Sequence, residues 1–274
     1  MSDIRDFLYE APGPKTKRTV AICTVVSLAA LAWLVAAVVR RFYLTGQLDA
    51  RYWEFFGRFT TWKFMAHGLA GTMKAALTAG CMAFCFGFAM MVGRISKGRL
   101  ARGISSALIE FSRGVPTLLF IYFFFLAAPQ MGLKLPAFWK ISVPVAISAS
   151  GIVAEVFRSG VNAVPKGQWE AAVSLGMRDS HVFMKIIFPQ ALRIVVPALI
   201  SELVIVLKDT TFAYVVNYAD LMQNAKVLIS NYDALLSVYL VVAIIYIIIN
   251  FLLNKASVSL ARRRRVSGAA VRQL

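Results

Sequence analysis

The chain has 274 residues, of which 59% are hydrophobic and 16% are charged, and its mean hydropathy is +0.69. Soluble domains are typically about 45–50% apolar and about 25% charged, so the composition excludes an ordinary soluble protein and predicts an integral membrane protein. The net charge of +17 does not indicate nucleic-acid binding, because lysine and arginine in a membrane protein mark the loops that stay in the cytoplasm.

Six segments are long and apolar enough to cross a bilayer, for which a helix needs roughly 20 mainly apolar residues. In chain order they are Val20–Val39, Phe64–Val92, Leu108–Ala128, Phe138–Phe157, Leu192–Val216 and Leu235–Leu253. The first is longer than the apolar part of a signal peptide and no Ala-x-Ala cleavage signal follows it, so it is predicted to stay as a span. We therefore expect an all-α, polytopic bundle of about six transmembrane helices.

Six spans place both termini on one side of the membrane, and the basic residues indicate which side. The segments 1–19, 94–103, 165–190 and 254–274 together hold 17 lysines and arginines, and the opposite set, 40–63, 128–140 and 208–232, holds nine. The excess predicts a multi-pass protein with both termini in the cytoplasm.

Two basic segments outside the spans have their own predicted roles. The segment 40–63 is aromatic and carries five cations, which is typical of a helix lying in the membrane interface. The run "ARRRR" at 261–265 is predicted to be an anionic-lipid anchor and a topology signal. We accordingly divide the chain into an amino-terminal part (1–62), a five-helix core (63–254) and a basic cytoplasmic tail (255–274).

Residue types that often bind metals or form disulfides have simpler interpretations here. Cys23, Cys81 and Cys85 lie inside apolar runs and are expected to be small packing residues. His67 and His181 each lack neighbouring ligands, so no metal site is expected. The glycines of the second span are expected to allow close helix packing; they are Gly68, Gly71, Gly80, Gly87 and Gly93.

A polar stretch, "EAAVSLGMRDSHVFMKIIFP", interrupts the apolar sequence at 170–189. Pro165 is predicted to begin a short helix before it, with Glu170 early in that helix, where the dipole favours a carboxylate. Ala171, Ala172 and Leu175 are expected to form a small apolar patch that lets another protein approach closely.

The second half of this stretch predicts a turn and another helix. Gly176 is expected to end the first helix in a left-handed conformation, and Asp179 to cap the helix that follows. Pro189 then marks the return of the chain to the membrane. The segment 165–189 is thus predicted to be a bent helix–turn–helix on the cytoplasmic side.

The spacing of this stretch resembles the EAA loop of ABC-importer permeases. That family's pattern is EAA, three residues, G, nine residues and I-x-L-P, and only the leucine differs here, being Phe188. The resemblance implies that 165–189 is a coupling loop whose helix seats in a groove of an ATP-binding subunit. It assigns this contact to Glu170, Ala171, Ala172, Leu175 and Gly176.

The resemblance covers most of the chain and is strongest for permeases of polar amino acids. "GLAGTMKAALTAG", "FSRGVPTLLFIYFFF", "AEVFRSGVNAVPKGQWEAA" and "LKDTTFAYVV" are similar to segments of the histidine/glutamine/glutamate/arginine group. The additional amino-terminal span resembles the glutamate-type subset. The resemblance implies import of a polar L-amino acid, glutamate or a relative, by alternating access across the bacterial inner or cytoplasmic membrane.

The same resemblance implies the partners and leaves this chain without catalytic residues or a cofactor. An extracytoplasmic binding protein would deliver substrate to two permease subunits, identical or related. Two ABC ATPase subunits would bind ATP and Mg. No Walker-type Gly-x4-Gly-Lys-Ser/Thr sequence is present, in agreement with ATP hydrolysis by separate subunits. The alternatives are a secondary transporter, for which no inverted repeat is evident and which leaves the 170–189 loop unexplained, and a non-transport scaffold.

Ionisable residues inside apolar spans are costly and are candidates for the substrate path. Glu155 and Arg158 share a helix face and either pair with each other or face the path. Lys208, Asp209 and Thr210 interrupt the fifth span, either as a helix end at the outer interface or as an unwound segment lining a cavity. Thr117, in the segment resembling the family's RG-x-P span, completes the candidate set.

Overall fold

The structure is a computed structural model that describes residues 13–270. These residues form helices and turns without β-strands, so the predicted all-α class is confirmed. The α-helices are α2 (Pro14–Leu44), α3 (Phe59–Ile95), α4 (Arg99–Gly114), α5 (Thr117–Tyr122), α6 (Ala128–Gln130), α7 (Ala137–Ala163), α8 (Lys166–Ser174), α9 (Asp179–Val182), α10 (Phe188–Asp209), α11 (Leu221–Tyr232) and α12 (Leu235–Ala270). Short 3-10 helices form η1 (Ala50–Tyr52), η2 (Glu54–Gly57) and η5 (Thr210–Val216), and π-helical turns form η3 (Phe123–Ala127) and η4 (Phe183–Ile187).

The chain divides into two compact units, Met1–Phe55 and Phe56–Leu274. In the first unit, α2 contains a 30-residue apolar segment, Lys15–Leu44, which is long enough to cross a membrane. The predicted interfacial helix at 40–63 is wrong: α2 continues to Leu44, two 3-10 turns follow, and α3 begins at Phe59. Gly46, with φ of +69°, turns the chain just after α2 ends.

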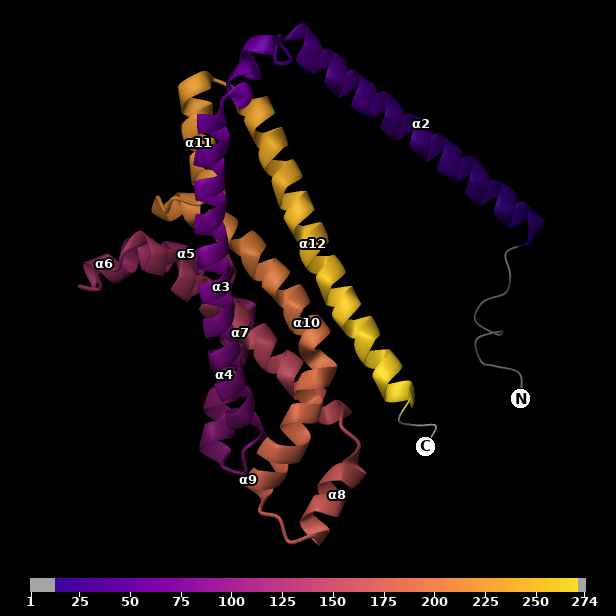
Figure 1. The fold of residues 1–274 in the computed structure, drawn as a ribbon, viewed down its shortest axis with the longest axis vertical. Coiled ribbons are helices and arrows are strands. Elements are labelled where there is room, and N and C mark those ends of the chain that lie inside the picture. The colour runs from indigo at the N-terminus through magenta and orange to yellow at the C-terminus, as the bar shows by residue number, and fades with distance from the viewer. Residues whose placement is uncertain (1–12, 271–274) are drawn as a thin grey trace. The chain divides into compact units, whose positions relative to one another are not determined.

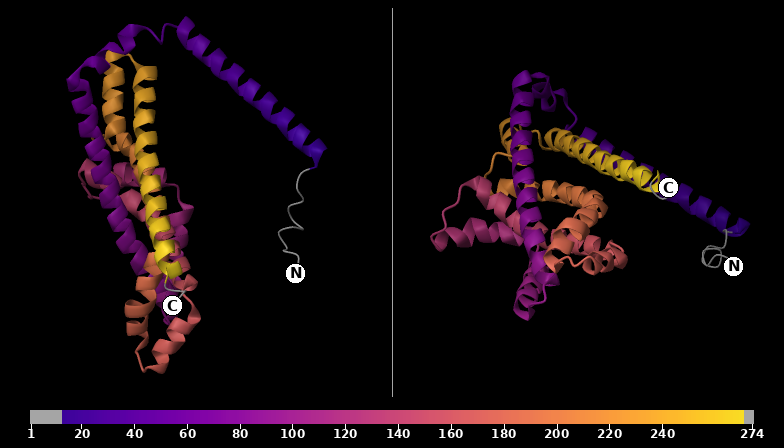
Figure 2. Two further views of the ribbon diagram at one scale, coloured as in Figure 1. Left: turned by 45° about the vertical axis from the view of Figure 1, so that its right-hand side comes forward. Right: turned by 60° about the horizontal axis from the view of Figure 1, so that its bottom comes forward.

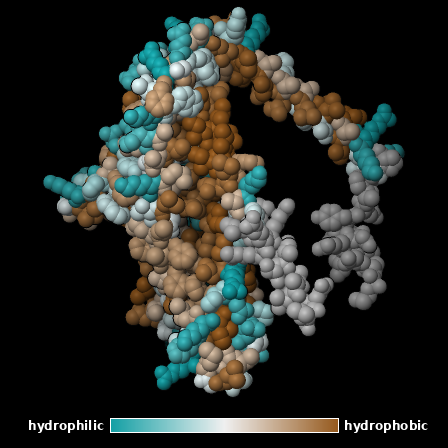
Figure 3. Space-filling view, in the orientation of Figure 1, coloured by the Kyte–Doolittle hydropathy of each residue, from teal (hydrophilic) through white to brown (hydrophobic). Residues whose placement is uncertain are grey.

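The second unit is built around α3 and α7, which pack closely and supply much of the buried core. Figures 1 and 2 show α3 running along the unit, with α11 beside it at one end and α4, α8 and α9 toward the other. In Figure 3 hydrophobic residues cover the middle of the visible face, and hydrophilic residues gather at the α8–α9 end. This distribution is the one expected of a membrane-spanning bundle.

Glycines of α3 permit the close packing that the sequence predicts. A Cβ at Gly71 would lie 2.2 Å from the carbonyl oxygen of Ala219, and a Cβ at Gly87 would lie 2.8 Å from that of Ser150. Because both obstacles are backbone atoms, no side-chain movement relieves them. The two positions fix how closely α3 approaches the segment before α11 and the middle of α7.

The third predicted span is not one straight helix. The segment Leu108–Ala128 runs from α4 through α5 and η3 to the start of α6. The helical segment Arg99–Gly114 meets the helical segment Thr117–Gln130 at 97°. Val115 is extended, with φ of −96° and ψ of 126°, as is typical of a residue that precedes a proline, here Pro116. The described residues thus contain five helices that can span a membrane, or six when this bent pair is counted as one span.

The fifth span is longer than predicted and is broken. A segment of 38 residues, Asp179–Val216, is apolar enough to cross the membrane, and it ends in the 3-10 helix η5. Asn217 then adopts a left-handed conformation with φ of 54°, and α11 begins at Leu221. In Figures 1 and 2, α11 continues beyond the break alongside α3, so the break lies within the bundle and not at its end.

The cysteines are not core residues, which corrects the prediction. Cys23, Cys81 and Cys85 are all exposed, and the two on α3 line a groove of about 340 Å³ between α3, α7 and α10. An apolar run in a membrane helix contains lipid-facing residues as well as packed ones, so hydropathy alone does not distinguish them.

Candidate functional site

The coupling loop (165–189) forms the predicted helix–turn–helix. Pro165 precedes α8, and α8 folds back on α9 and η4 at one end of the second unit (Figure 1). Val164, Ala172 and Val182 form a small separate core with Ile187 and Ala191. The amide of Gln190 donates to the side-chain oxygen of Gln168 across the hairpin, at 3.1 Å. The loop is therefore a packed hairpin with its own apolar centre.

Gly176 makes the turn after α8 as predicted. Its φ of +76° lies in the left-handed region, where residues with a Cβ are strained. Its backbone N–H donates to the carbonyl of Val173 at 2.9 Å, and that of Met177 donates to the carbonyl of Ala172 at 3.2 Å. These two bonds satisfy carbonyls left free at the helix end, as in a glycine-terminated helix.

The predicted apolar patch on α8 is only partly correct. Leu175 is 83% exposed and Ala171 is also exposed, but Ala172 is 2% exposed and belongs to the loop's own core. Ala172 is therefore unavailable to a docking partner in this conformation. Glu170 is exposed, but it is the fifth residue of α8, beyond the first turn where the helix dipole acts.

Asp179 bonds to another element instead of capping α9. Arg178 is the cap residue, and its side chain makes no capping hydrogen bond. The carboxylate of Asp179 accepts a hydrogen bond from Lys97 at 2.6 Å, and this bond and the charge of Asp179 raise the pKa of Lys97. Because Lys97 follows the end of α3, the ion pair connects the longest helix of the core to the coupling loop.

A partly buried polar network lies where the fifth span breaks. The Thr117 hydroxyl donates to the carboxylate of Asp209 at 2.8 Å and lies 2.9 Å from the Ser148 hydroxyl. The three residues come from α5, α7 and the last position of α10, so the network joins three helices. Thr117 and Asp209, both predicted from the sequence, are thus brought together, whereas Ser148 was not predicted.

Glu202 is a second acidic residue of this region that the sequence analysis missed. It is 6% exposed, it lines the groove between α3, α7 and α10, and its Oε1 atom has no hydrogen-bond partner among the described residues. It precedes Asp209 by seven residues, which places both carboxylates on one face of α10. That spacing is visible in the sequence and is the signal that could have identified it.

The other predicted residues of the interrupted span have different environments. Lys208 is exposed, whereas Thr210 is completely buried and donates its hydroxyl to the carbonyl of Leu207 at 2.7 Å. The Thr210 hydroxyl thus satisfies a backbone group where α10 changes to a 3-10 helix.

Glu155 lies within a cluster of arginines that connects α3, α4 and α7. Its carboxylate accepts hydrogen bonds from Arg94 and from Arg158, the latter at 2.7 Å, and Arg113 lies 3.7 Å away. Glu155 also follows Ser148 by seven residues on α7, so it lies about 10 Å from the polar network along the helix axis. The predicted pairing of Glu155 with Arg158 is confirmed, and the structure adds two further arginines.

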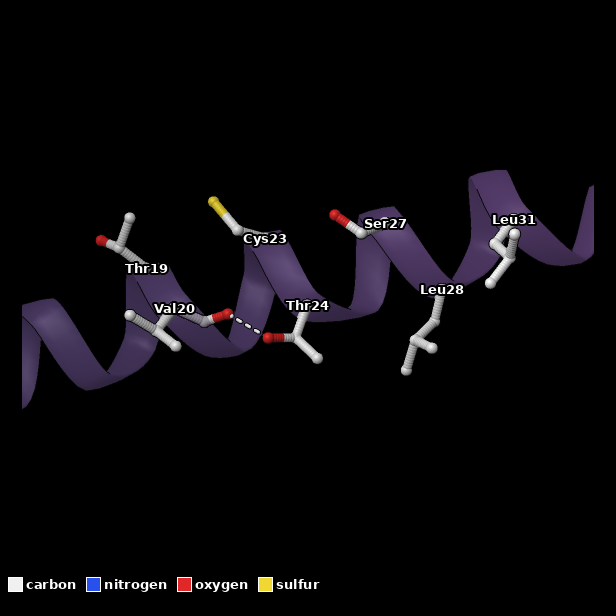
Figure 4. Close-up of a pocket in the computed structure, with 7 residues that line it drawn as sticks. All are labelled: Thr19, Val20, Cys23, Thr24, Ser27, Leu28 and Leu31. Carbon is white, nitrogen blue, oxygen red and sulfur yellow. Dashed lines mark hydrogen bonds between the residues drawn. The ribbon is translucent and has the colours of Figure 1, made fainter. Parts of the chain in front are cut away.

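Other features of the described residues provide no site. A hollow on α2 is lined by residues of that helix alone (Figure 4): Thr19, Val20, Cys23, Thr24, Ser27, Leu28 and Leu31. Its Thr24 hydroxyl already donates to the carbonyl of Val20 at 2.8 Å. Among the described residues, no group of three or more histidines, cysteines or acidic residues could hold a metal ion.

The helical core, its coupling loop and its membrane-crossing segments define a membrane subunit of a transport system. The family of binding-protein-dependent transport system inner membrane components matches residues 85–266, and the chain belongs to this family. It is therefore a multi-pass inner-membrane permease subunit of an ABC importer, non-catalytic itself and working with ATPase partners.

Its relatives place it among the amino-acid permeases. It is 34% identical to the glutamate transport system permease protein GluD of Corynebacterium glutamicum, over 82% of this chain and 84% of that protein. It is also 34% identical to the probable glutamine ABC transporter permease protein GlnM of Bacillus subtilis, over 68% of this chain and 87% of that protein.

One solved structure agrees with this placement, and a second shows the same fold. The chain resembles a crystal structure of an amino acid ABC transporter with histidines, with 30% sequence identity and a TM-score of 0.71 over 76% of this chain and 98% of that one. A structure of the MetNI methionine ABC transporter shares the fold, with 17% identity and a TM-score of 0.59 over 74% of this chain and 99% of that one.

Proposed function

We propose that this permease subunit moves a polar L-amino acid, glutamate or a relative, into the cell by alternating access. The observation that carries the proposal is the pair of carboxylates on one face of α10, Glu202 and Asp209, beside a helix break. A desolvated amino acid needs a hydrogen-bond partner for its ammonium group. The buried Oε1 atom of Glu202, which has no hydrogen-bond partner among the described residues, can supply one. The names of the relatives support glutamate or glutamine as the substrate class.

In this proposal, different residues bind the ammonium group and the carboxylate groups of the substrate. Glu202 binds the ammonium group, and Asp209 places a second negative charge further along the same face of α10. The Thr117 hydroxyl, which is itself bonded to the Ser148 hydroxyl, holds the Asp209 carboxylate in place. Lys208, whose side chain is exposed, is the candidate for the substrate carboxylate. Glu155 and Arg158 lie further along the path, where the arginine cluster would meet the side-chain carboxylate of an acidic substrate.

The partners follow from the same proposal. An ABC ATPase that holds ATP and Mg docks on the exposed face of α8, through Glu170, Ala171, Leu175 and the turn at Gly176. A second permease subunit, identical or related, completes the pathway, and an extracytoplasmic binding protein delivers the amino acid. Both termini and the coupling loop face the cytoplasm, and lipid surrounds the apolar faces.

The test is transport by the complete complex in liposomes, with Glu202→Gln and Asp209→Asn compared with wild type across several amino acids. We expect the apparent KM for uptake to rise about tenfold or more in both variants, which corresponds to about 1.4 kcal/mol of lost binding. Ser201→Ala is the matched control, because Ser201 is exposed beside Glu202 and bonds only to the carbonyl of Pro197.

Two outcomes contradict the proposal. Unchanged KM and selectivity in both carboxylate variants would remove these residues from the substrate path. Uptake that continues without ATP, driven by an ion gradient alone, would favour the secondary transporter instead.

A further inference from the structure

A groove of about 860 Å³ lies between the end of α3, the end of α7 and the coupling loop, and none of the proposed substrate-binding groups lines it. One wall is α3 and the other is η4, and α8 closes the end of the groove. It is larger than the groove of about 340 Å³ between α3, α7 and α10.

The inner part of this groove is apolar and begins inside the membrane-crossing segment. Phe88, Val92 and Ile95 lie on successive turns of α3, within the candidate span Phe59–Ile95. Phe183 and Met184 of η4 form the facing wall. A soluble partner would reach these side chains only by entering the region where α3 crosses the bilayer, so an occupant from the membrane is favoured.

The outer part of the groove is basic. Lys97 follows the end of α3, Lys166 begins α8, and both side chains are exposed at the opening. Asp179, which binds Lys97 at 2.6 Å, is the one acidic residue of the lining, so the opening carries a net positive charge. Trp169 also lines this end, and tryptophan favours the headgroup level of a membrane.

We propose that this groove binds one anionic phospholipid, with an acyl chain along α3 and η4 and the phosphate group between Lys97 and Lys166. The change from apolar to basic along a single axis matches a phospholipid, whose chain and headgroup have the same order. A headgroup in this position contacts both α3 and the coupling loop. Lipid binding would therefore fix the coupling loop against the core beside the Lys97–Asp179 ion pair.

The first experiment counts lipids bound to the complete transporter by native mass spectrometry after addition of phosphatidylglycerol or phosphatidylcholine. We expect the double variant Lys97→Gln/Lys166→Gln to retain at least threefold less phosphatidylglycerol at this site than wild type. Arg178→Gln/Lys185→Gln is the matched control, because it removes the same charge from exposed residues of the same loop that do not line the groove. Equal retention by the two double variants would overturn the proposal.

The second experiment uses the groove's own tryptophan. Brominated phosphatidylglycerol should quench the Trp169 fluorescence, defined as the signal lost in Trp169→Phe, more than brominated phosphatidylcholine does. Val92→Trp places a large side chain in the space proposed for the acyl chain, so it should abolish binding of a spin-labelled phosphatidylglycerol. Ile247→Trp, on the exposed face of α12, should leave that binding unchanged. Equal quenching by the two lipids would refute a preference for anionic headgroups. Loss of quenching when the ATPase binds would show that the ATPase, and not a lipid, occupies the groove in the complete transporter.

Discussion

Glu155 faces three guanidinium groups at the junction of α3, α4 and α7, and its side chain is 19% exposed. Replacing Glu155 with Gln removes the charge while leaving Arg94, Arg113 and Arg158 close together. We expect Glu155→Gln to lower the free energy of unfolding by about 2 kcal/mol, because a charged hydrogen bond contributes about 1.5–3 kcal/mol and the site is partly wet. Thermal unfolding of the purified complex measures the change.

The matched control is Glu110→Gln, which touches the same arginines. Its carboxylate lies 3.8 Å from Arg94 and 3.9 Å from Arg113, but its side chain is 63% exposed. Exposed ion pairs contribute little, so this variant should lose less than about 1 kcal/mol. Equal losses in the two variants would show that Glu155 is not the centre of the cluster.

Ala172 and Leu175 separate folding from docking on α8. Ala172→Arg forces a charge into the loop's small core, so we expect misfolding of the loop and a lower yield of inserted protein. Leu175→Arg alters a side chain that is 83% exposed, so the protein should insert normally and lose only its ATPase partner. Membrane-fraction yield and copurification of the ATPase measure the two effects, and a Leu175→Arg variant that still copurifies the ATPase would exclude Leu175 from the contact.

Sequence reasoning found some residues of the candidate site and missed others for physical reasons. Asp209 and Thr117 were found because an acidic residue in an apolar span is costly and because Thr117 follows a recognisable motif. Glu202 carries the same cost but stands in a long apolar run without a neighbouring break. The inward orientation of Ala172 depends on which face of α8 meets α9, and spacing within one short helix does not determine that.

At the scale of elements, the contact between α3 and the segment before α11 depends on two missing side chains, at Gly68 and Gly71, and the closer of the two is Gly71. Gly71→Ala would place a Cβ 2.2 Å from the backbone oxygen of Ala219, so the two segments must separate. We expect a loss of about 1–3 kcal/mol in the free energy of unfolding, as is typical of overpacking. Gly103→Ala on α4 is the control, since nothing lies within 4 Å of its added Cβ and alanine favours a helix. The two melting temperatures should move in opposite directions, and a stabilised Gly71→Ala would contradict the packing described.

The helices themselves were predictable from hydrophobic length, but their bends were not. A hydropathy window counts apolar residues and does not record the direction of the chain, so α4 and α5 were merged into one span. The Val115–Pro116 sequence contained the signal for the bend. The coupling loop was predicted better, because Pro165 and Gly176 specify backbone conformations directly.

At the scale of the whole molecule, the proposed topology can be tested by labelling single cysteines in intact cells. In a background lacking Cys23, Cys81 and Cys85, we expect Lys134→Cys to react with a membrane-impermeant thiol reagent and Arg178→Cys to remain unlabelled until the cells are broken. Both positions are exposed, so access and not burial determines the result. Labelling of Arg178→Cys in intact cells would reverse the topology and place the coupling loop outside.

The length of α3 has a consequence for the protein that would deliver substrate. Its uncharged residues 75–93 span about 28 Å, close to the roughly 30 Å of a hydrocarbon core, whereas Lys63, His67 and Lys74 lie in the preceding turns. Those turns, residues 59–74, extend α3 by up to about 24 Å beyond the uncharged segment and pack against α11. A delivering protein that docks at the outer end of residues 59–74 lies more than a Debye length from the headgroups. The Debye length is about 8 Å at physiological ionic strength. Mobile ions therefore screen it from the membrane's surface potential, and docking should change little between neutral and anionic bilayers.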